Sequence, residues 1–432
     1  MTTVVLHHNH ERLPQATDDI IPVVMYNRRN AQRDDLAAIG QPVLDKLKRL
    51  GVAIDPVAMD FLSIALAITA ADTFVLRKHA VDGWVREITL RIPLNEPERW
   101  LAVQPKLEKV LHFLSGDIWR IEIEADGFPP AAPYGLRHKL ISLQGRNCVC
   151  LFSGGLDSAV GAIDLLATNR SPLLVSQAYN KDNSKQKAIA QSLGGSYSRF
   201  SANVHPLSAD GKTEVSMRTR SINFLAFATI GCSVVRAANN LERVDLFVPE
   251  NGFISLNAPL TTRRIGSLST RTTHPYFLSI MQEIFNDVGM RVNIINPYQF
   301  LTKGEMIHNC RNQDALQTVV SDTVSCSHWK RQNQQCGRCV PCIIRRAAIK
   351  RGNMQEPDFY QFQRLSEVLQ YDEFKDDLFA VMNAIQQRNL RPIGSWIVNS
   401  GPIPPEDFDA YKSIFVRGLN EVEQLLIEER VL

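Results

Sequence analysis

A short glycine-containing segment between an apolar run and a helical run constrains the fold of this chain more than any other feature. The segment follows the apolar residues Cys148 to Phe152 and reads Ser153-Gly154-Gly155-Leu156-Asp157-Ser158. This pattern is typical of a strand, a tight turn and a helix that begins near Asp157. In a parallel sheet such turns lie at the carboxyl ends of the strands, where ligands bind. The segment therefore predicts an α/β fold with a ligand site at this turn.

The residue types in the turn suit phosphate groups. Adjacent glycines let backbone amides approach a phosphate with no Cβ in the way, and amides at a helix N-terminus favour an anion. The hydroxyls of Ser153 and Ser158 add hydrogen-bond donors, and Asp157 is a suitable ligand for a Mg²⁺ ion. The alternative is a plain strand–helix turn that Asp157 or Ser158 caps. Because five positions match together, we predict that residues 153–158 bind phosphates.

Strand-like and helical segments alternate after this turn. Strand-like runs cover residues 172–177, 197–204 and 244–248, and helical runs cover residues 184–193 and 221–238. Strands that alternate with helices predict a parallel sheet with helices on both faces.

The regions on either side differ in pattern. The first ~125 residues combine a helical run from Met59 to Leu76, strand-like runs at 85–92 and 119–123, and an amphipathic helix around residues 107–114. Residues 127–133 contain three prolines, which break both helix and strand, and the sequence after about Gln355 is helical. We therefore expect an accessory α/β domain at 1–126, a linker at 127–146, a catalytic domain at 147–354 and a helical extension at 355–432. The histidines at positions 7, 8 and 10 are expected to lie in a disordered terminus rather than in a metal site.

Four cysteines near the end of the expected catalytic domain predict a metal centre. They have the spacing C-x₉-C-x₂-C-x₂-C and are Cys326, Cys336, Cys339 and Cys342. Two successive C-x₂-C steps bring three thiolates to one turn, and four thiolates suit a structural Zn²⁺. An iron–sulfur cluster has the same ligand set and remains the alternative. His328 is expected to lie outside the ligand set, and the other four cysteines to pack in the core.

Composition excludes several classes of protein. The 432 residues are enough for two or three domains, and the formal net charge of +3 includes no basic stripe of the kind that nucleic-acid binders carry. The N-terminus lacks the layout of a signal peptide, and the longest uncharged apolar stretch, Phe61 to Ala71, is too short to span a bilayer. We expect a cytoplasmic protein with no membrane contact and no direct contact with nucleic acid, in which cysteines serve metal binding rather than disulfides.

The turn at residues 153–158 resembles the PP-loop of the N-type ATP pyrophosphatases, which cleave ATP between its α- and β-phosphates. Together with the cysteine cluster, it resembles the QueC family of 7-cyano-7-deazaguanine synthases over residues 147–352. Weaker matches are Arg220 at the start of a helix, the segment Leu301-Thr302-Lys303-Gly304-Glu305 against the family's Thr-Lys-Ala-Glu, and Val324-Ser325-Cys326. The resemblance implies an adenine nucleotide alpha hydrolase-like fold and a homodimer.

The resemblance also implies a reaction and its cofactors. ATP, with Mg²⁺, would adenylate the carboxylate of 7-carboxy-7-deazaguanine, ammonia would displace AMP, and a second ATP would help to dehydrate the amide, while Zn²⁺ fills the cysteine site. Residues Ser153 to Ser158 would bind ATP, Asp157 and Ser158 would act in catalysis, and Lys303 or Arg220 would offset phosphate charge. The alternative for Lys303 is a surface lysine at a helix start.

Two departures from QueC stand out. The segment after Val248-Pro249 reads Glu250-Asn251-Gly252-Phe253-Ile254-Ser255-Leu256-Asn257, where QueC has an Asp-containing stretch that ends in Pro-Asp-Cys-Arg, and both flanks are long. These departures resemble the QatC family of Qat anti-phage defence operons. That resemblance implies a role in defence with an ATPase, a nuclease and a small companion protein, and an acceptor other than ammonia, such as a protein amine.

Two competing hypotheses stay open from the sequence. A PP-loop enzyme that inserts sulfur needs an iron–sulfur cluster or a persulfide-bearing cysteine, for which Cys150 is the nearest candidate. An assembly subunit that binds ATP without turning it over would keep the loop but show no release of pyrophosphate.

Overall fold

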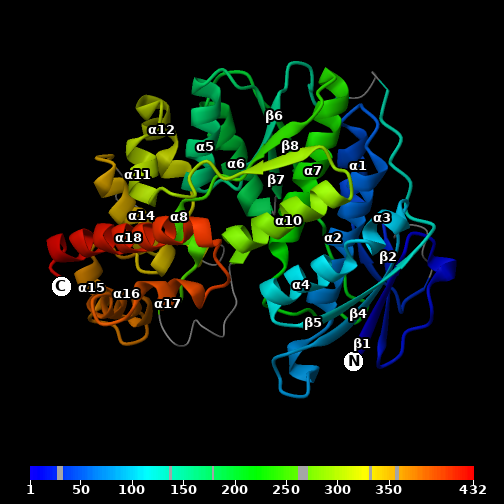
Figure 1. The fold of residues 1–432 in the computed structure, drawn as a ribbon, viewed down its shortest axis with the longest axis horizontal. Coiled ribbons are helices and arrows are strands. Elements are labelled where there is room, and N and C mark those ends of the chain that lie inside the picture. Colours follow the sequence, from blue (N-terminus) through cyan, green and yellow to red (C-terminus); the bar gives the residue numbers. More distant parts are fainter. Residues whose placement is uncertain (27–32, 136–138, 178–179, 261–270, 330–332, 356–359) are drawn as a thin grey trace.

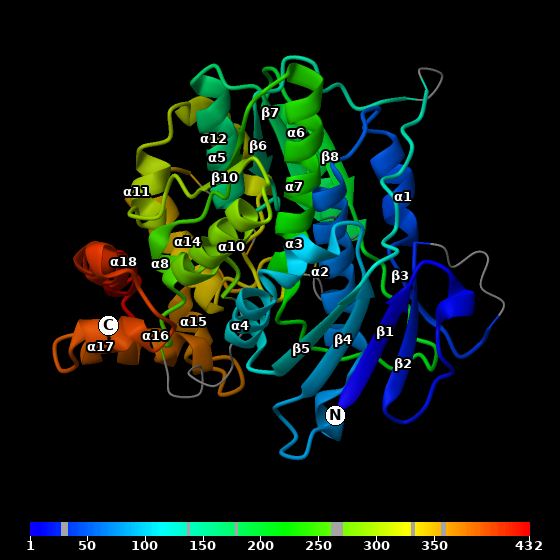
Figure 2. The same ribbon diagram turned by 45° about the vertical axis from the view of Figure 1, so that its right-hand side comes forward.

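The chain forms two five-stranded sheets in which every strand pair is parallel, together with a helical C-terminal region (Figures 1 and 2). The computed structural model describes residues 1–26, 33–135, 139–177, 180–260, 271–329, 333–355 and 360–432. Both sheets with their helices confirm the predicted α/β class, and the helices after residue 360 agree with the predicted helical extension.

The first sheet belongs to the N-terminal region. Its order is β3-β2-β1-β4-β5, and its strands are β1 (Thr2–His7), β2 (Ile20–Met25), β3 (Ala37–Ile39), β4 (Glu87–Pro93) and β5 (Ile118–Glu124). The expectation of a disordered terminus is wrong, because β1 is the central strand and buries Val4 and Leu6. His7 and His8 stack with ring centroids 4.6 Å apart, and neither belongs to a metal-binding group among the described residues.

Four helices accompany this sheet. They are α1 (Gln41–Lys48), α2 (Pro56–Phe74), α3 (Pro97–Leu101) and α4 (Gln104–Ser115). Helix α4 buries Leu107, Val110, Leu111 and Leu114, which are the residues whose spacing predicts an amphipathic helix.

The second sheet carries the glycine-containing turn. Its order is β10-β9-β6-β7-β8, and its strands are β6 (Cys148–Leu151), β7 (Pro172–Gln177), β8 (Ser198–Ala202), β9 (Val244–Phe247) and β10 (Val292–Ile295). The helices α5 (Leu156–Ala167), α6 (Asn180–Ser192), α7 (Arg220–Asn239) and α10 (Pro275–Asp287) accompany it. The predicted parallel sheet is confirmed, although β10 has no counterpart in the prediction because only Val292 of its four residues is buried.

Helices α2 and α7 pack against each other and join the two sheets into one hydrophobic core (Figure 2). Both are long and apolar enough to cross a membrane. However, the apolar stretch of α2 is fully buried inside the protein, and 78% of that of α7 is buried. A helix that is apolar on all sides is either a core helix or a membrane span, and this burial accounts for both helices as core helices.

The remaining helices form the left side of the molecule in Figure 1. The short α8 (Gly252–Leu256), α11 (Lys303–His308) and α12 (Gln313–Val319) precede α14 (Val340–Arg351), which is followed by α15 (Leu365–Val368), α16 (Asp376–Gln387), α17 (Ile393–Val398) and α18 (Phe408–Glu428). Helix α18 packs on α14 and α8, so the C-terminal region closes over the part of the chain that follows the second sheet.

Candidate nucleotide site and cysteine centre

The turn after β6, residues 153–158, has the geometry that a phosphate-binding loop needs, and we call it the phosphate loop after its predicted role. Gly154 has a φ of +84°, a left-handed conformation that glycine adopts without strain. Helix α5 has Gly155 as its N-cap and no side-chain cap, so neither Asp157 nor Ser158 caps it. Instead, Ser158 Oγ donates to the Gly155 carbonyl at 2.9 Å and lies 3.2 Å from Ser153 Oγ. The plain capped turn is therefore not the arrangement found, and the first-turn amides of α5 lack a side-chain acceptor.

Asp157 lies at the centre of a buried polar cluster. Its Oδ2 accepts hydrogen bonds from the backbone amide (3.1 Å) and the side-chain amide (2.6 Å) of Asn251, and its Oδ1 accepts from Lys303 Nζ. Asp157 is 5% exposed and Lys303 is 6% exposed. Lys303 is thus a buried partner of the phosphate loop, and its interpretation as a surface lysine is wrong.

Glu250 completes this cluster with a second carboxyl group. Burial raises the pKa of Asp157, but the charge of Lys303 and the hydrogen bonds outweigh burial and hold that pKa below its usual range. Burial and the charge of Asp157 raise the pKa of Glu250 well above its usual value. The cluster therefore holds an ionised Asp157 paired with Lys303, and Glu250 as a neutral acid beside them.

The expected role of Asp157 as a Mg²⁺ ligand does not fit this arrangement. Both of its carboxylate oxygens already accept hydrogen bonds, one of them from the cationic Lys303. A hard cation needs free oxygen ligands, and a buried ammonium beside the carboxylate repels it. The use of Mg²⁺ thus stays a prediction.

The cluster lies where the strand order of the second sheet reverses. Strands β6 and β9 are neighbours, and the chain runs outward from β6 on one side and from β9 on the other. The phosphate loop follows β6, and Glu250 and Asn251 follow β9. Ligands of open α/β sheets bind at such a switch point. Sequence reasoning noted Glu250 and Asn251 only as a departure from QueC and missed their contact with Asp157.

Two cavities flank the phosphate loop. The first, which we call the loop cavity, has a volume of about 450 Å³ and is lined by Gly155, Leu156, Asp157 and Lys303. The second, which we call the helix cavity, has a volume of about 750 Å³ and reaches from the loop to the start of α7. Both lie within the usual range for small-molecule sites. Five residues line both cavities, namely Ser153, Ser158, Pro249, Glu250 and Thr272.

Arg220 and Lys303 do not come together. Arg220 is the first residue of α7, is exposed and lines the helix cavity, whereas Lys303 lines the loop cavity. The two cations predicted to offset phosphate charge therefore face different cavities.

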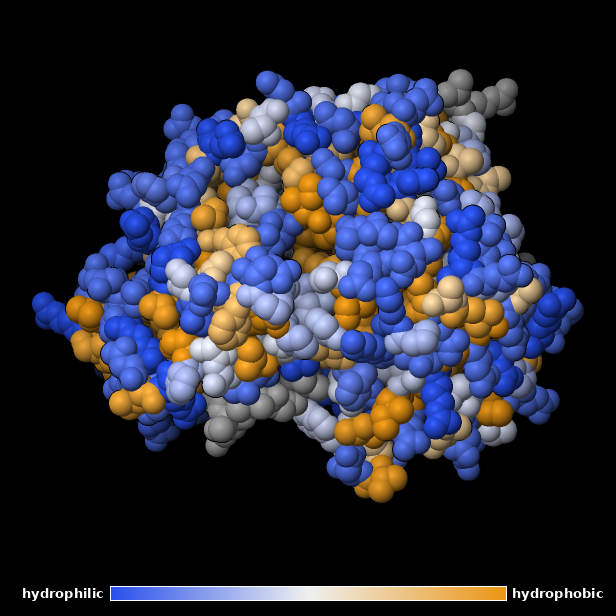
Figure 3. Space-filling view, viewed as in Figure 1, coloured by the Kyte–Doolittle hydropathy of each residue, from blue (hydrophilic) through white to orange (hydrophobic). Residues whose placement is uncertain are grey.

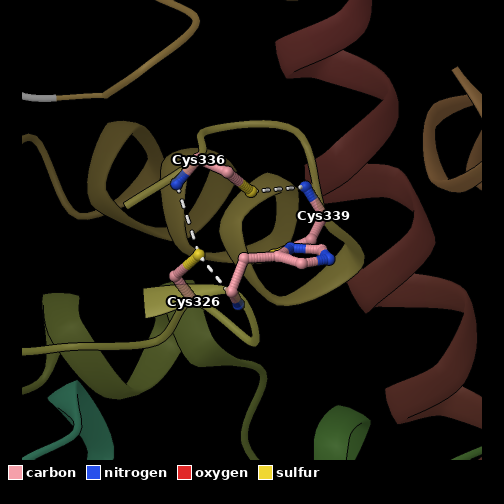
Figure 4. A group of neighbouring side chains, drawn as sticks. Cys326, Cys336 and Cys339 are labelled. Carbon is pink, nitrogen blue, oxygen red and sulfur yellow. Dashed lines mark hydrogen bonds between the residues drawn. The ribbon is translucent and has the colours of Figure 1, made fainter. Parts of the chain in front are cut away.

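The cysteine centre is assembled as its spacing predicts, with one addition, and Figure 4 draws Cys326, Cys336 and Cys339 of this group. One ligand atom from each of Cys326, His328, Cys336 and Cys339 lies within 4.8 Å of all the others, and Cys342 Sγ lies 4.0 Å from Cys336 Sγ. Nδ1 of His328 is buried and has no hydrogen-bond partner among the described residues. His328, expected outside the ligand set, is therefore a fifth candidate donor beside the four cysteines.

The chemistry of these donors suits one Zn²⁺ ion. Cys326 Sγ accepts hydrogen bonds from the backbone amides of His328 (3.3 Å) and Cys336 (3.2 Å). Cys336 Sγ accepts a hydrogen bond from the backbone amide of Cys339 (3.3 Å). Hydrogen bonding among the thiols lowers the pKa of Cys326 to about 6. Tetrahedral ligands at about 2.3 Å from zinc lie about 3.8 Å apart. An iron–sulfur cube holds its cysteine sulfurs farther apart, so the spacing here favours a single ion.

The cysteine centre is linked directly to the phosphate loop. The amide of Val324 donates to the Gly154 carbonyl at 3.1 Å, and the amide of Ser325 donates to Gln335 Oε1 at 3.0 Å. The fully buried Arg345 donates to the carbonyls of Val320 (2.6 Å) and Thr323 (3.2 Å). The segment from Val320 to Cys336, which leads into the cysteine centre, therefore also holds one side of the phosphate loop.

The C-terminal helix α18 holds the turn that carries Lys303. Glu421 accepts hydrogen bonds from Thr302 Oγ1 and from the amide of Gly304 at 3.2 Å. Arg417 Nε pairs with Glu305 Oε1 at 2.7 Å. A Cβ on Gly304 would lie 2.6 Å from Glu421 Oε1 of α18 and 2.7 Å from Arg351 Cγ of α14, so both helices approach this turn closely.

These features define a class of protein, an α/β fold with a candidate phosphate-binding turn and a cysteine-rich candidate metal centre beside it. Residues 273–353 match the family model described as Queuosine biosynthesis protein QueC, a segment that contains Lys303 and the cysteine cluster. The matched segment is thus QueC-like, which favours ATP-dependent chemistry of the carboxylate-activating, C–N bond-forming kind. No curated protein matches the chain.

Proposed function

We propose that the protein adenylates a carboxylic acid with ATP and transfers the acyl group to an amine. The observation that carries this proposal is the combination at the loop cavity: an α5 N-terminus without a side-chain cap, a left-handed Gly154 and the buried Lys303–Asp157 pair. Backbone amides and a buried ammonium are the groups that stabilise the charge of a triphosphate. The triphosphate therefore lies in the loop cavity.

This arrangement supports a reaction in two steps. A carboxylate oxygen attacks the α-phosphorus, the bond to the β-phosphate breaks, and pyrophosphate leaves toward the amides of α5 and Lys303. The amine nitrogen then attacks the carbonyl carbon, the bond to the AMP oxygen breaks, and an amide forms as AMP departs with the carboxylate oxygen and takes up the proton that the amine loses. The neutral Glu250 lies between the two cavities and is positioned to hold or pass a proton.

The acid and its acceptor follow from the resemblances. A 7-carboxy-7-deazaguanine-like acid is the substrate that the QueC-like segment suggests. The altered segment at residues 250–257 and the long flanks support an acceptor other than ammonia, namely an amine of a partner protein encoded in the same defence operon. A homodimer and a cytoplasmic location are part of this proposal.

Two alternatives are less favoured. Sulfur insertion through Cys150 requires a reactive thiolate, but Cys150 is fully buried and burial raises its pKa well above the usual value. A nucleotide-binding subunit without turnover would need no buried cation and acid at the loop. Binding of ATP without release of pyrophosphate would favour this second alternative.

The test is release of pyrophosphate from ATP in the presence of 7-carboxy-7-deazaguanine, followed by mass spectrometry of the intact operon partner. We expect AMP and pyrophosphate rather than ADP, and a partner mass increased by one acyl group. Turnover with an unchanged partner mass and a free amide would restrict the reaction to ammonia. An absence of pyrophosphate with every acid offered would reject adenylation.

A further inference from the structure

The N-terminus of α7 carries an unpartnered polar group that faces the helix cavity. Helix α7 has 20 residues, and its N-cap Thr219 makes no side-chain hydrogen bond to the helix. The next residue but one, Ser221, lines the cavity and is 3% exposed, and its Oγ has no hydrogen-bond partner among the described residues. A buried hydroxyl without a partner is unfavourable, so a ligand that supplies an acceptor would satisfy it.

Two arginines give this end of the cavity a positive charge. Arg220 lines the cavity and makes no ion pair with the described residues. Arg218 is 7% exposed, and it donates from Nη1 to the Ser115 carbonyl at 2.9 Å. Among the described residues no carboxylate lies within ion-pairing distance of Arg218. Two arginines without carboxylate partners, at the N-terminus of a long helix, favour an anion.

The N-terminal region contributes one aromatic side chain to the lining of the helix cavity. Trp84, between α2 and β4, lines the cavity, and the Arg218 guanidinium lies 4.2 Å from the centre of its ring. Trp84 is 43% exposed and its neighbour Val81 is fully exposed. Figure 3 shows hydrophobic side chains at the lower edge of the molecule. In Figure 1 the segment that connects α2 to β4 lies at this edge. A half-exposed indole beside a guanidinium suits contact with a flat ring.

A buried charge network holds these parts in place. Asp72 Oδ2 accepts hydrogen bonds from the backbone amides of Arg218 (2.9 Å) and Thr219 (3.0 Å) and from the hydroxyl of Thr219 (2.8 Å). This last bond turns the Thr219 hydroxyl away from α7 and leaves the helix without a side-chain cap. Asp72 Oδ1 also pairs with Arg86 at 2.5 Å. The N-terminal region thus fixes the conformation of the chain that enters the cavity.

We propose that the helix cavity binds a planar aromatic carboxylate, with the carboxylate at Ser221 and Arg220 and the ring against Trp84 and Arg218. The cavity shares Ser153 and Ser158 with the loop cavity, so an acid bound there lies beside the triphosphate. This inference rests on the proposed function only in naming the ligand as the acid that is adenylated.

Calorimetric binding of 7-carboxy-7-deazaguanine and, separately, of α,β-methylene-ATP tests the proposal. Ser221→Ala should raise the Kd of the acid about tenfold, the effect of one hydrogen bond to a charged group, and Arg220→Gln should raise it at least as much. Neither variant should change the Kd of the ATP analogue. Because Ser221 Oγ has no partner in the free protein, Ser221→Ala should leave thermal stability unchanged or slightly higher.

Ser233→Ala is the matched control on the same helix. Ser233 Oγ accepts the amide of Asp55 at 2.9 Å, so this variant should lose stability and keep the Kd of the acid. An unchanged Kd of the acid in Ser221→Ala, a weaker Kd for the ATP analogue instead, or no binding of the acid by the unmodified protein overturns the inference. Normal binding of the acid without release of pyrophosphate keeps the site and rejects adenylation.

Discussion

The two sheets of this protein share one topology, yet only one of them carries the candidate site. In each sheet the first strand is central, the second and third lie on one side and the fourth and fifth on the other. Each therefore has a switch point between its first and fourth strands, which are β1 and β4 in one sheet and β6 and β9 in the other. The same topology thus provides the same crevice twice.

The difference lies in the segments that come after the strands. In the first sheet, the ring of Phe128 packs against that of Tyr26 with centroids 4.6 Å apart. The Phe128 carbonyl accepts a hydrogen bond from Asn95 Nδ2 at 3.0 Å. The neighbouring Gly127 lies so close that a Cβ would be 2.3 Å from the Asn95 amide nitrogen. In the second sheet, cavities remain at the corresponding position. A switch point becomes a site only when the chain leaves it open and supplies the polar groups.

The largest effect is expected from Asp157→Ala in the second sheet. It leaves Lys303 buried without its partner and removes the acceptor of Asn251, so release of pyrophosphate should fall by at least about a thousandfold. A radiolabelled ATP assay measures this. Asp60, which holds Asn95 in the first sheet, provides the control, since Asp60→Ala should reduce stability but not turnover per folded molecule. Full turnover in Asp157→Ala would remove the basis for the difference between the sheets.

Loss of the metal should come next. Cys336→Ser, or removal of Zn²⁺ by a chelator, should lower the free energy of unfolding by several kcal/mol and weaken ATP binding, because Val324 then no longer holds Gly154. Denaturant unfolding and ATP-analogue titration measure the two effects. Cys232→Ala, a buried cysteine outside the cluster, should leave ATP binding unchanged. A metal-free protein with normal ATP affinity would separate the cysteine centre from the site.

A smaller effect tests the contribution of the C-terminal helix. Gly304→Ala places a Cβ against Glu421 and should displace Lys303, which should lower the rate of pyrophosphate release about ten- to hundredfold. Glu421→Ala, which removes the α18 acceptor of Thr302 and Gly304 and adds no Cβ to the turn, should lower the rate as well. If Glu421→Ala reacts at the normal rate, α18 does not set the position of Lys303.

Opening the first crevice should cost stability alone. Phe128→Ala removes a part-buried ring and should lower the free energy of unfolding by about 2 kcal/mol, measured by denaturant titration. Pyrophosphate release per folded molecule should stay the same. A loss of turnover would show that the filled crevice contributes to the site.

The smallest effect concerns pH. The pKa of Glu250 is raised in the folded protein, so its contribution to stability is complete below the unfolded value of about 4.3 and is lost as pH rises through the folded pKa. Asp157 has a lowered pKa, so its contribution is present above about 3.9 and is lost in acid. Glu250→Gln should therefore flatten the alkaline side of the stability profile and leave the acid side unchanged. Thermal unfolding from about pH 2 to about pH 9, a range that spans both unfolded values, measures this.

Local sequence patterns determined much of this protein. The glycine-containing turn, the alternation of strands and helices after it and the C-x₂-C-x₂-C run each act within a few residues, so their spacing alone predicts the second sheet, the phosphate loop and the metal centre. The buried position of Lys303 was open from the sequence, because a lysine at a helix start is usually exposed.

Only the tertiary structure decided which distant residues complete the site. Glu250 and Asn251 reach Asp157 because β9 lies beside β6, Glu421 reaches the Lys303 turn because α18 packs on α14, and Phe128 closes the first crevice because the chain returns across β4. These contacts join residues that are 33 to 117 positions apart. No local pattern encodes them, because they depend on how helices and sheets pack rather than on the conformation of neighbouring residues.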